Sequence, residues 1–243
     1  MKVYSNSFFH FTNNLEHLQE IIHTGFNVYF CKEEVYSSER SVVHIGIPMV
    51  SFCDTPLLYL TQNSYGKYCI GMKRKWAVEH QLQPVLYYPN NQECQSTKMI
   101  VSATEDFLRD KKDSDKYRIL GYSKPLYKIE CDKETTRDNY VEREWRKVYA
   151  SRNQFVWLTE TEYDLYRGDK NHPKTPIGVP LKFSANDVDI IIVQEKDVLR
   201  LIDYIMRGGF TYVGGKENTT VNNRDRELLL SKVATFESLA NNM

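Results

Sequence analysis

The chain has 243 residues, 41% hydrophobic and 13% aromatic, which is enough to build a substantial core in one large domain or two small ones. Lys and Arg together number 32, as do Asp and Glu, so the overall charge gives no support for non-specific binding to nucleic acid or an anionic membrane. The five cysteines are odd in number and form no C-x-x-C pair, which argues against a disulfide framework and against a zinc site.

The sequence also carries no targeting signal that we can identify. Its first residues lack the basic and apolar regions of a signal peptide, and no apolar run reaches the roughly 18 residues of a membrane span. We therefore expect a cytoplasmic protein that does not associate with membranes.

The N-terminal part predicts a strand, a helix and a second strand. Aromatic residues at 8–11 indicate the first strand, Asn13 with Glu16 indicates a helix start, and Gly25 indicates the helix end. The segment 31–44 is charged and rich in serine, so we expect a mobile loop there that lies over a site.

The middle of the chain predicts further short elements in alternation. Asp54-Thr55-Pro56 is typical of a helix start, because a capping residue is followed by proline. We expect strands at 26–30, 47–53, 68–72, 84–88, 117–122, 126–130 and 142–149, and helices at 73–80 and 96–112.

The C-terminal part begins with a polar segment, 164–180, that predicts a long surface loop. A buried strand is expected at 188–193, followed by a helix at 196–207 that two glycines end. The chain is polar again from residue 214, and a last helix is expected after Arg224.

The segment 140–149 places Glu142, Glu144 and Arg146 two residues apart on a predicted strand. At that period the three side chains share one face, within reach of one substrate. One carboxylate could then orient a nucleophile while the other holds a sugar hydroxyl or a developing cation. A solvated, salt-bridged strand is the alternative, since alternating charges on a half-exposed strand are ordinary.

Other catalytic and binding motifs are missing from the sequence. There is no phosphate-binding glycine loop and no G-x-S-x-G elbow, and His17 and His23 are six residues apart, a spacing that does not align two metal ligands. We expect no metal site.

His10 lies within a run of aromatics and is followed two residues later by Thr12. If this polar pair is buried, both side chains need hydrogen-bond partners.

Several motifs in order resemble the AbiGi family of bacterial abortive-infection, phage-resistance proteins. They are FHFTN at 9–13, PMVSFCDTPL at 48–57, YGKYCIGM at 65–72, WA at 76–77, PVLYY at 84–88 and EREWR at 142–146. The resemblance implies an antitoxin-like protein of a two-gene phage-defence system, encoded beside a nucleotidyltransferase-like toxin.

A fainter resemblance concerns chemistry. An H-[FY]-T strand, a helix ended by glycine and a late strand with E-x-E are similar to ADP-ribosyltransferases. The resemblance implies that Glu144 holds the ribose 2′-hydroxyl of NAD+ and stabilises the oxocarbenium-like transition state, with Glu142 as the preceding member of the pair and Arg146 on the same face.

The same resemblance assigns the remaining contacts to NAD+, the substrate that such an enzyme would use. His10 would contact the nicotinamide ribose, with Phe11 and Thr12 beside it on the strand, and Arg146 is a further expected contact to NAD+. An aromatic side chain would stack on nicotinamide, and either Tyr29 or Tyr36 could take that place.

The sequence therefore predicts a single α+β domain over residues 1–243, with a split, mostly antiparallel sheet, short flanking helices and an ADP-ribosyltransferase-like scaffold. The family resemblance is densest at 8–149, and 214–243 forms a polar segment and helix. The expected function is phage defence by ADP-ribosylation of a protein or nucleic-acid acceptor. The alternative is a noncatalytic antitoxin that neutralises or counteracts a partner toxin.

Overall fold

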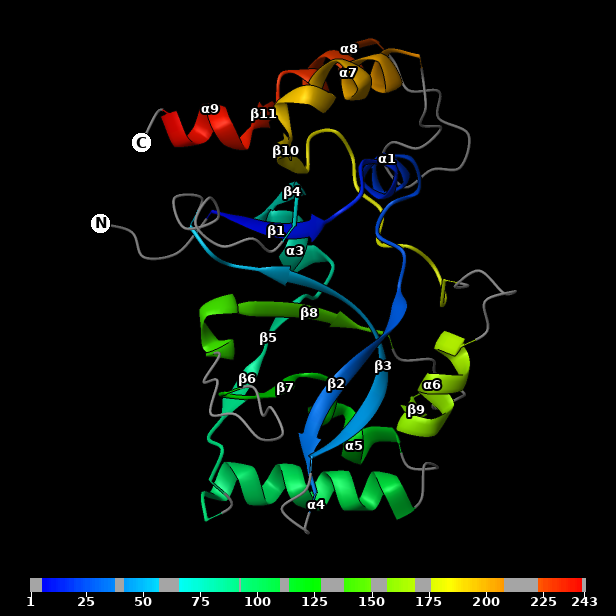
Figure 1. The fold of residues 1–243 in the computed structure, drawn as a ribbon, viewed down its shortest axis with the longest axis vertical. Coiled ribbons are helices and arrows are strands. Elements are labelled where there is room, and N and C mark those ends of the chain that lie inside the picture. Colours follow the sequence, from blue (N-terminus) through cyan, green and yellow to red (C-terminus); the bar gives the residue numbers. More distant parts are fainter. Residues whose placement is uncertain are drawn as a thin grey trace. The chain divides into compact units, whose positions relative to one another are not determined.

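The computed structural model describes residues 6–37, 42–56, 66–91, 93–109, 114–127, 138–149, 157–168, 176–207 and 223–241. The chain divides into two compact units (Figure 1). Unit 1 comprises residues 1–27, 51–82 and 179–243, and unit 2 comprises residues 28–50 and 83–178. Whether the whole chain acts as one domain stays a prediction.

Unit 1 is built around a β-sheet whose central strands are antiparallel. β1 (Ser7–Thr12) pairs with β4 (Tyr68–Lys73) over its whole length and with the end of β3 (Val42–Cys53), where Phe9 lies opposite Cys53. β4 then pairs with antiparallel β10 (Val188–Val193), and β10 pairs with parallel β11 (Val233–Thr235).

Helix α1 (Leu15–Thr24) follows β1 directly and buries one apolar face. Asn14, rather than Asn13, caps it by accepting a 2.7 Å hydrogen bond from the backbone N–H of Glu16. Gly25 ends it as expected, with a φ of 92° and so little room that a Cβ would lie 2.6 Å from the carbonyl oxygen of Leu181. The described residues of this unit also form α3 (Arg74–Glu79), η2 (Glu195–Asp197), α7 (Val198–Met206), α8 (Asn223–Leu230) and α9 (Phe236–Asn241).

Unit 2 contains a long antiparallel hairpin of β2 (Tyr29–Tyr36) and β3, which Figure 1 shows as a twisted ribbon. β3 also pairs with β9 (Leu158–Thr159) and neighbours β8 (Glu144–Val148), whose far edge pairs with β5 (Gln83–Pro84). A separate small sheet joins β6 (Leu86–Tyr88) to parallel β7 (Ser123–Pro125).

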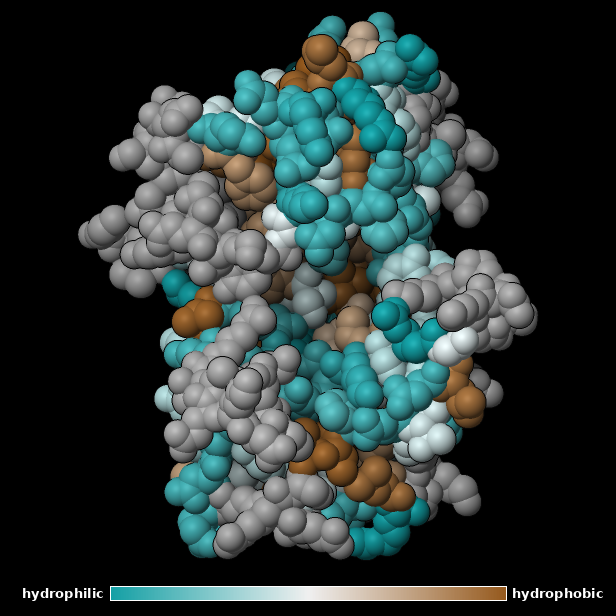
Figure 2. All heavy atoms as spheres, viewed as in Figure 1, coloured by the Kyte–Doolittle hydropathy of each residue, from teal (hydrophilic) through white to brown (hydrophobic). Residues whose placement is uncertain are grey.

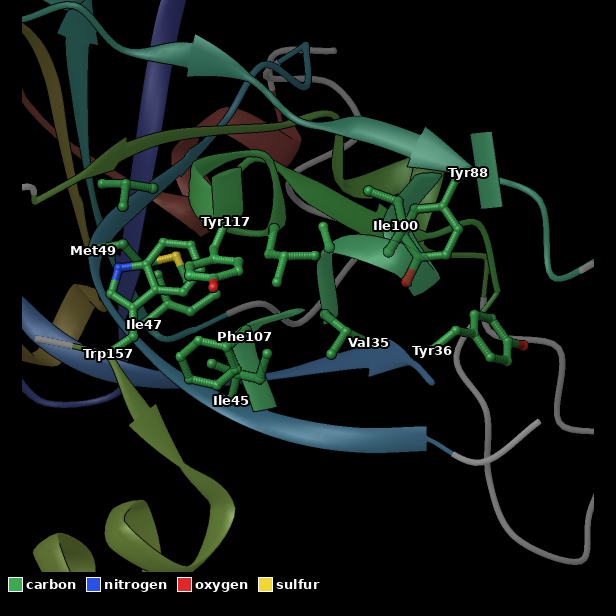
Figure 3. Packing of buried hydrophobic residues seen from close by; sticks show 13 residues of the cluster. Val35, Tyr36, Ile45, Ile47, Met49, Tyr88, Ile100, Phe107, Tyr117 and Trp157 are labelled. Atoms are coloured by element: carbon green, nitrogen blue, oxygen red, sulfur yellow. The ribbon is translucent and has the colours of Figure 1, made fainter. Parts of the chain in front are cut away.

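The core of unit 2 fills the space between the larger sheet, which contains β2, β3 and β8, and two helices, α4 (Gln95–Arg109) and α5 (Ser114–Gly121) (Figure 3). Phe107 and Tyr117 come from the helices and pack with Trp157, while Ile45, Ile47 and Met49 enter from β3. The remaining elements are η1 (Asn139–Glu142), a 3-10 turn, and helix α6 (Glu160–Gly168). The described residues thus form a mixed helix and strand protein with mostly antiparallel pairing, compatible with the expected α+β class.

Several predicted elements are wrong in kind or position. Most of 31–44 is the β2–β3 hairpin rather than a loop, because Val35 and Tyr36 are buried and the pairing runs as far as Tyr36 opposite Val42; residues 38–41 lie outside the described part. The expected strand at 117–122 is largely helix α5, whose Tyr117, Leu120 and Gly121 are buried at helical spacing.

Other differences lie further along the chain or in element bounds. The polar segment 164–180 begins inside helix α6, which has no fully buried residue and packs on the β2–β3 hairpin through the half-buried rings of Tyr163 and Tyr166. Val233 belongs to strand β11 rather than to the last helix, and the strand expected at 26–30 begins only at Tyr29. The helix expected after Pro56 and the glycines after Arg207 fall outside the described residues.

Candidate functional site

A cluster of charged side chains in unit 2 forms the candidate site, and strand β8 places its centre. Along this strand Glu144, Arg146 and Val148 are buried, while the two residues between them are half-buried. The period-two pattern therefore puts Glu144 and Arg146 on one face, as the sequence predicts, but that face is turned to the interior. The side chain of Arg146 is 0% exposed.

Arg146 is held by hydrogen bonds in several directions. Its Nε donates to Glu144 Oε1 at 2.6 Å and its Nη2 to Glu144 Oε2 at 2.9 Å, the paired geometry that a guanidinium makes with a carboxylate. Nη2 also donates to Glu33 Oε2 at 2.6 Å, and Nη1 donates to the carbonyl oxygen of Gly121 at 3.1 Å. This one side chain thereby links β8, β2 and the end of α5.

Lys124 of β7 joins a third carboxylate to the cluster. Its Nζ lies 3.1 Å from Glu144 Oε2 and 2.6 Å from Glu142 Oε2. The hydroxyl of Tyr87 accepts a 2.9 Å hydrogen bond from the backbone N–H of Glu144, which fixes the start of β8. Both oxygens of Glu144 are thus engaged by cations.

The pKa shifts in this cluster follow from burial and from these contacts. Burial alone lowers the pKa of Lys124, but the carboxylates of Glu144, Glu33 and Glu142 outweigh it and raise the pKa above its usual value. The pKa of Arg146 is raised in the same way against burial, by Glu33 and Glu144. Burial raises the pKa of Glu33, and the nearby Arg146 guanidinium offsets only part of that rise. Both cations therefore stay charged at neutral pH.

A pocket of about 230 Å³ lies against this cluster. Its walls combine carboxylate, ammonium and amide groups from β2, β7 and η1, contributed by Lys32, Glu33, Glu34, Lys124, Pro125, Asn139 and Glu142. Glu144 and Arg146 are not among the residues that line it. The pocket is smaller than the roughly 300–1,000 Å³ of a typical site for a drug-sized ligand.

The three residues predicted at 142–146 are brought together, although not all on the strand. Glu142 lies in η1 and not on β8, because Arg143 has a left-handed backbone with φ 45° that breaks the extended run. Glu142 nevertheless meets Glu144 through Lys124. The prediction that Glu142 belongs to the strand is therefore wrong, whereas its closeness to Glu144 is observed.

The predicted NAD+ contacts lie on three different strands, with Arg146 buried on β8 and the others on β1 and β2. His10, Phe11 and Thr12 are in β1 of unit 1, where the His10 ring packs against Phe26 at 5.3 Å and Phe52 at 5.5 Å between centroids. Its Nδ1 lies 2.8 Å from the carbonyl oxygen of Ser51. Burial lowers the pKa of His10, and the Ser51 contact only partly offsets this.

The two candidate aromatics both lie on β2 in unit 2. Tyr36 is buried in the core, with its ring 6.1 Å from that of Tyr88, whereas Tyr29 is half-buried at the other end of the strand. Neither lines the pocket. Which of them, if either, meets a nicotinamide stays a prediction.

The sequence-based search missed Glu33, Lys124 and Tyr87. Glu33 fell within the segment expected to be a loop, and Lys124 between two expected strands. Each reaches the cluster by a contact between distant parts of the chain, which a local pattern cannot reveal. The E-x-E-x-R pattern indicates only that partners are needed: if this face is buried, its charged side chains require oppositely charged groups from other elements.

Comparison with known proteins identifies the family. A family model described as "Putative abortive phage resistance protein AbiGi, antitoxin" matches residues 24–194, which is more than half of the chain. The chain belongs to the AbiGi family. The expected resemblance is thereby confirmed, and the matched range contains the whole charged cluster but not His10.

A curated relative agrees with the AbiGi assignment. The chain is 25% identical to "Abortive phage resistance protein AbiGi" from Lactococcus lactis subsp. cremoris, with 79% of this chain and 87% of the relative covered. No solved structure matches the chain.

The part of the chain that the structure describes contains neither a metal-ligand cluster nor a membrane-spanning helix. Within those residues no group of three or more His, Cys, Asp or Glu side chains is arranged to hold a metal ion. Among the helices of the same described part, none is both long and apolar enough to span a bilayer.

Proposed function

We propose that this protein is the antitoxin of a two-gene phage-defence system and neutralises a partner toxin by binding it, without chemistry of its own. The family description names an antitoxin, and the relative is named as an abortive phage resistance protein. These names supply the biological setting of the proposal.

The proposal that the protein is not catalytic rests on the contacts and the burial of the Glu144 carboxylate. Its carboxylate is engaged on both oxygens by Arg146 and also by Lys124, and its side chain is 8% exposed. A carboxylate that stabilises a ribosyl cation must face the substrate, whereas this one lies behind the pocket wall. Its contacts are those of a buried structural ion pair.

A growth assay tests this proposal. The product of the neighbouring gene is expressed in a bacterial host, alone and together with this protein. We expect the neighbouring product to arrest growth, co-expression to restore it, and the two proteins to copurify. Arrest that persists at matched expression levels, or rescue without any physical association, would contradict neutralisation by binding.

A second candidate is an ADP-ribosyltransferase that uses NAD+ to modify a protein or nucleic-acid acceptor, built on an ADP-ribosyltransferase-like scaffold. One observation favours it, because Glu142 lines the pocket and lies beside Lys124, which also contacts Glu144. In this scheme Glu142 and Glu144 are the catalytic pair.

Nicotinamide release from NAD+ tests this second candidate. The purified protein is incubated with NAD+ and with lysate as a source of acceptor. The enzyme hypothesis predicts nicotinamide release that Glu142→Gln abolishes, and the antitoxin proposal predicts none from either protein.

A further inference from the structure

Exposed apolar side chains gather beside the pocket, on η1 and the end of the β7 segment. Tyr140 is 57% exposed, Val141 48% and Tyr127 40%. Tyr127 bridges to Asp138, and the backbone N–H of Asn139 donates to the carbonyl oxygen of Leu126, so these exposed residues lie on two hydrogen-bonded neighbouring segments. Hydrophilic residues dominate the face that Figure 2 shows, with separate apolar areas between them. An exposed aromatic group next to a pocket is typical of a binding surface.

Two hydrogen bonds and one ring contact fix the η1 turn that carries Tyr140 and Val141. Asp138 accepts a 2.8 Å hydrogen bond from the backbone N–H of Tyr140, and Asn139 donates from Nδ2 to the carbonyl oxygen of Pro125 at 3.0 Å. The Tyr140 ring packs edge-on against Tyr87 at 5.3 Å. A surface held in this way loses little conformational entropy when a partner binds.

The same turn also forms one wall of the pocket, through Asn139 and Glu142. The residues that line the pocket include three carboxylates, from Glu33, Glu34 and Glu142, against two ammonium groups. One of these, Lys32, is engaged by Glu160 at 3.0 Å and Asp164 at 3.3 Å, two acids that do not line the pocket. Arg146, behind the pocket wall, pairs with Glu33, but Glu144 there adds a fourth carboxylate, so four carboxylates against three cations leave an excess of one negative charge.

We propose that η1 and this pocket form a docking surface for a basic segment of a partner protein, with one arginine side chain entering the pocket. Tyr140, Val141 and Tyr127 then contact the residues that flank this arginine. The proposal rests on the proposed antitoxin function and names the chemistry by which the toxin would be recognised.

An arginine suits the pocket better than other groups do. Its planar guanidinium donates hydrogen bonds in a fork that matches carboxylates, and its flat faces stack on tyrosine rings. A phosphate group would meet the carboxylates of Glu33, Glu34 and Glu142, which repel it, so a nucleic acid or an anionic lipid is not favoured. The volume of about 230 Å³ is on the scale of one side chain rather than a dinucleotide.

The direct test is a chemical-shift titration of the isotope-labelled full chain with N-acetyl-L-argininamide, and separately with inorganic phosphate. We expect argininamide to shift the backbone amides of Glu34, Lys124, Asn139 and Glu142 together, and phosphate to leave them unchanged. Argininamide shifts that are absent or lie elsewhere would overturn the proposal, as would saturable phosphate binding in the pocket.

Charge removal sharpens this test. Glu34→Gln combined with Glu142→Gln should weaken argininamide binding at least tenfold, whereas Glu93→Gln, an exposed acid paired with Lys98 outside the pocket, should leave it unchanged. Because Glu142 also contacts Lys124, Glu34→Gln alone serves as a second variant, with an expected loss of several-fold. Equal affinity in all variants would refute the carboxylate contact.

A toxin-binding measurement separates this proposal from the antitoxin function itself. Tyr140→Ser removes an exposed ring without touching an ion pair and should weaken binding of the neighbouring gene's product at least tenfold. If the wild-type chain binds no toxin, the antitoxin function fails, while the argininamide result still decides the pocket. If the wild type binds and Tyr140→Ser binds equally well, the docking surface is refuted and the antitoxin function stands.

Discussion

Replacement of Arg146 by methionine is expected to destabilise the protein by about 3–5 kcal/mol, the cost of leaving a buried charge without its partner. The side chain is 0% exposed and donates to Glu144, Glu33 and the carbonyl oxygen of Gly121. Methionine is unbranched and flexible enough to fill the space but donates no hydrogen bond. The buried carboxylate of Glu144 and the half-buried one of Glu33 then lose their shared cation.

The size of this loss can be compared with the total stability of a domain, which is about 5–15 kcal/mol. Arg146→Met would therefore remove a large part of it. Arg146→Lys keeps the charge but loses the paired geometry with Glu144, so a smaller cost of about 1–3 kcal/mol is expected for the donors and acceptors left unmatched.

Urea unfolding followed by circular dichroism at neutral pH measures these differences. Arg207→Met is the matched control, because Arg207 is 79% exposed and makes a 2.7 Å ion pair with Asp203. A surface pair of this kind contributes about 1 kcal/mol or less. If Arg146→Met costs no more than Arg207→Met, the buried cluster does not hold unit 2 together and the reasoning is refuted.

A double-mutant cycle adds a second check on the same contact. Glu144→Gln should destabilise on its own, since a neutral amide cannot satisfy both cations. Combined with Arg146→Met, its effect should be non-additive by about 0.5–3 kcal/mol, as is usual for residues in one network. Additive effects would show that the two side chains do not depend on each other.

Three further substitutions test unit 1, and a fourth, in unit 2, serves as a control. The pKa of His10 is lowered by burial, so the unfolded chain binds a proton more readily than the folded chain does. Stability should therefore fall as the pH drops below about 6.5, and His10→Gln should lessen that fall in thermal melts. Gly25→Ala should cost more than about 1 kcal/mol, because φ is 92° and the added Cβ would meet Leu181, while Gly168→Ala, with nothing within 4 Å, should not destabilise. Asn14→Ala should cost about 1 kcal/mol of unfolding free energy through loss of the helix cap, and an unchanged value would contradict the cap.

The elements that the sequence predicts well are those whose signals are local. The aromatic run at 8–11, the glycine after the first helix and the run of β-branched residues at 188–193 all correspond to observed elements. Each combines a hydrophobic pattern with a turn or cap residue within a few positions.

The elements that it predicts poorly depend on distant partners. β2 contains Lys32, Glu33 and Glu34 in succession, which is typical of a loop, yet β3 pairs with it residue by residue and Arg146 neutralises Glu33. Helix α6 has no fully buried residue and is held by contacts with β2, where Tyr166 packs on Phe30 and where Glu160 and Asp164 pair with Lys32. Tertiary contacts override local propensity at both places.

The candidate site was only partly predictable for the same reason. The alternation of Glu144 and Arg146 correctly places both on one face, but the sequence does not tell whether that face meets solvent, a substrate or the interior. The structure shows that the face meets the interior of unit 2. Arg146 is buried there and contacts Glu33 and Glu144, and Glu144 also contacts Lys124. The Lys124–Glu144 contact joins residues 20 positions apart, and the Arg146–Glu33 contact joins residues 113 positions apart.

The most direct test of the proposed function is a titration of the neighbouring gene product's toxic activity with purified protein, with and without NAD+. Neutralisation by binding predicts that activity falls in proportion to the protein added and ends at a fixed, near-equimolar ratio, with no effect of NAD+. Complete loss of toxin activity at a small fraction of equimolar protein, only when NAD+ is present, would contradict it and establish catalysis instead.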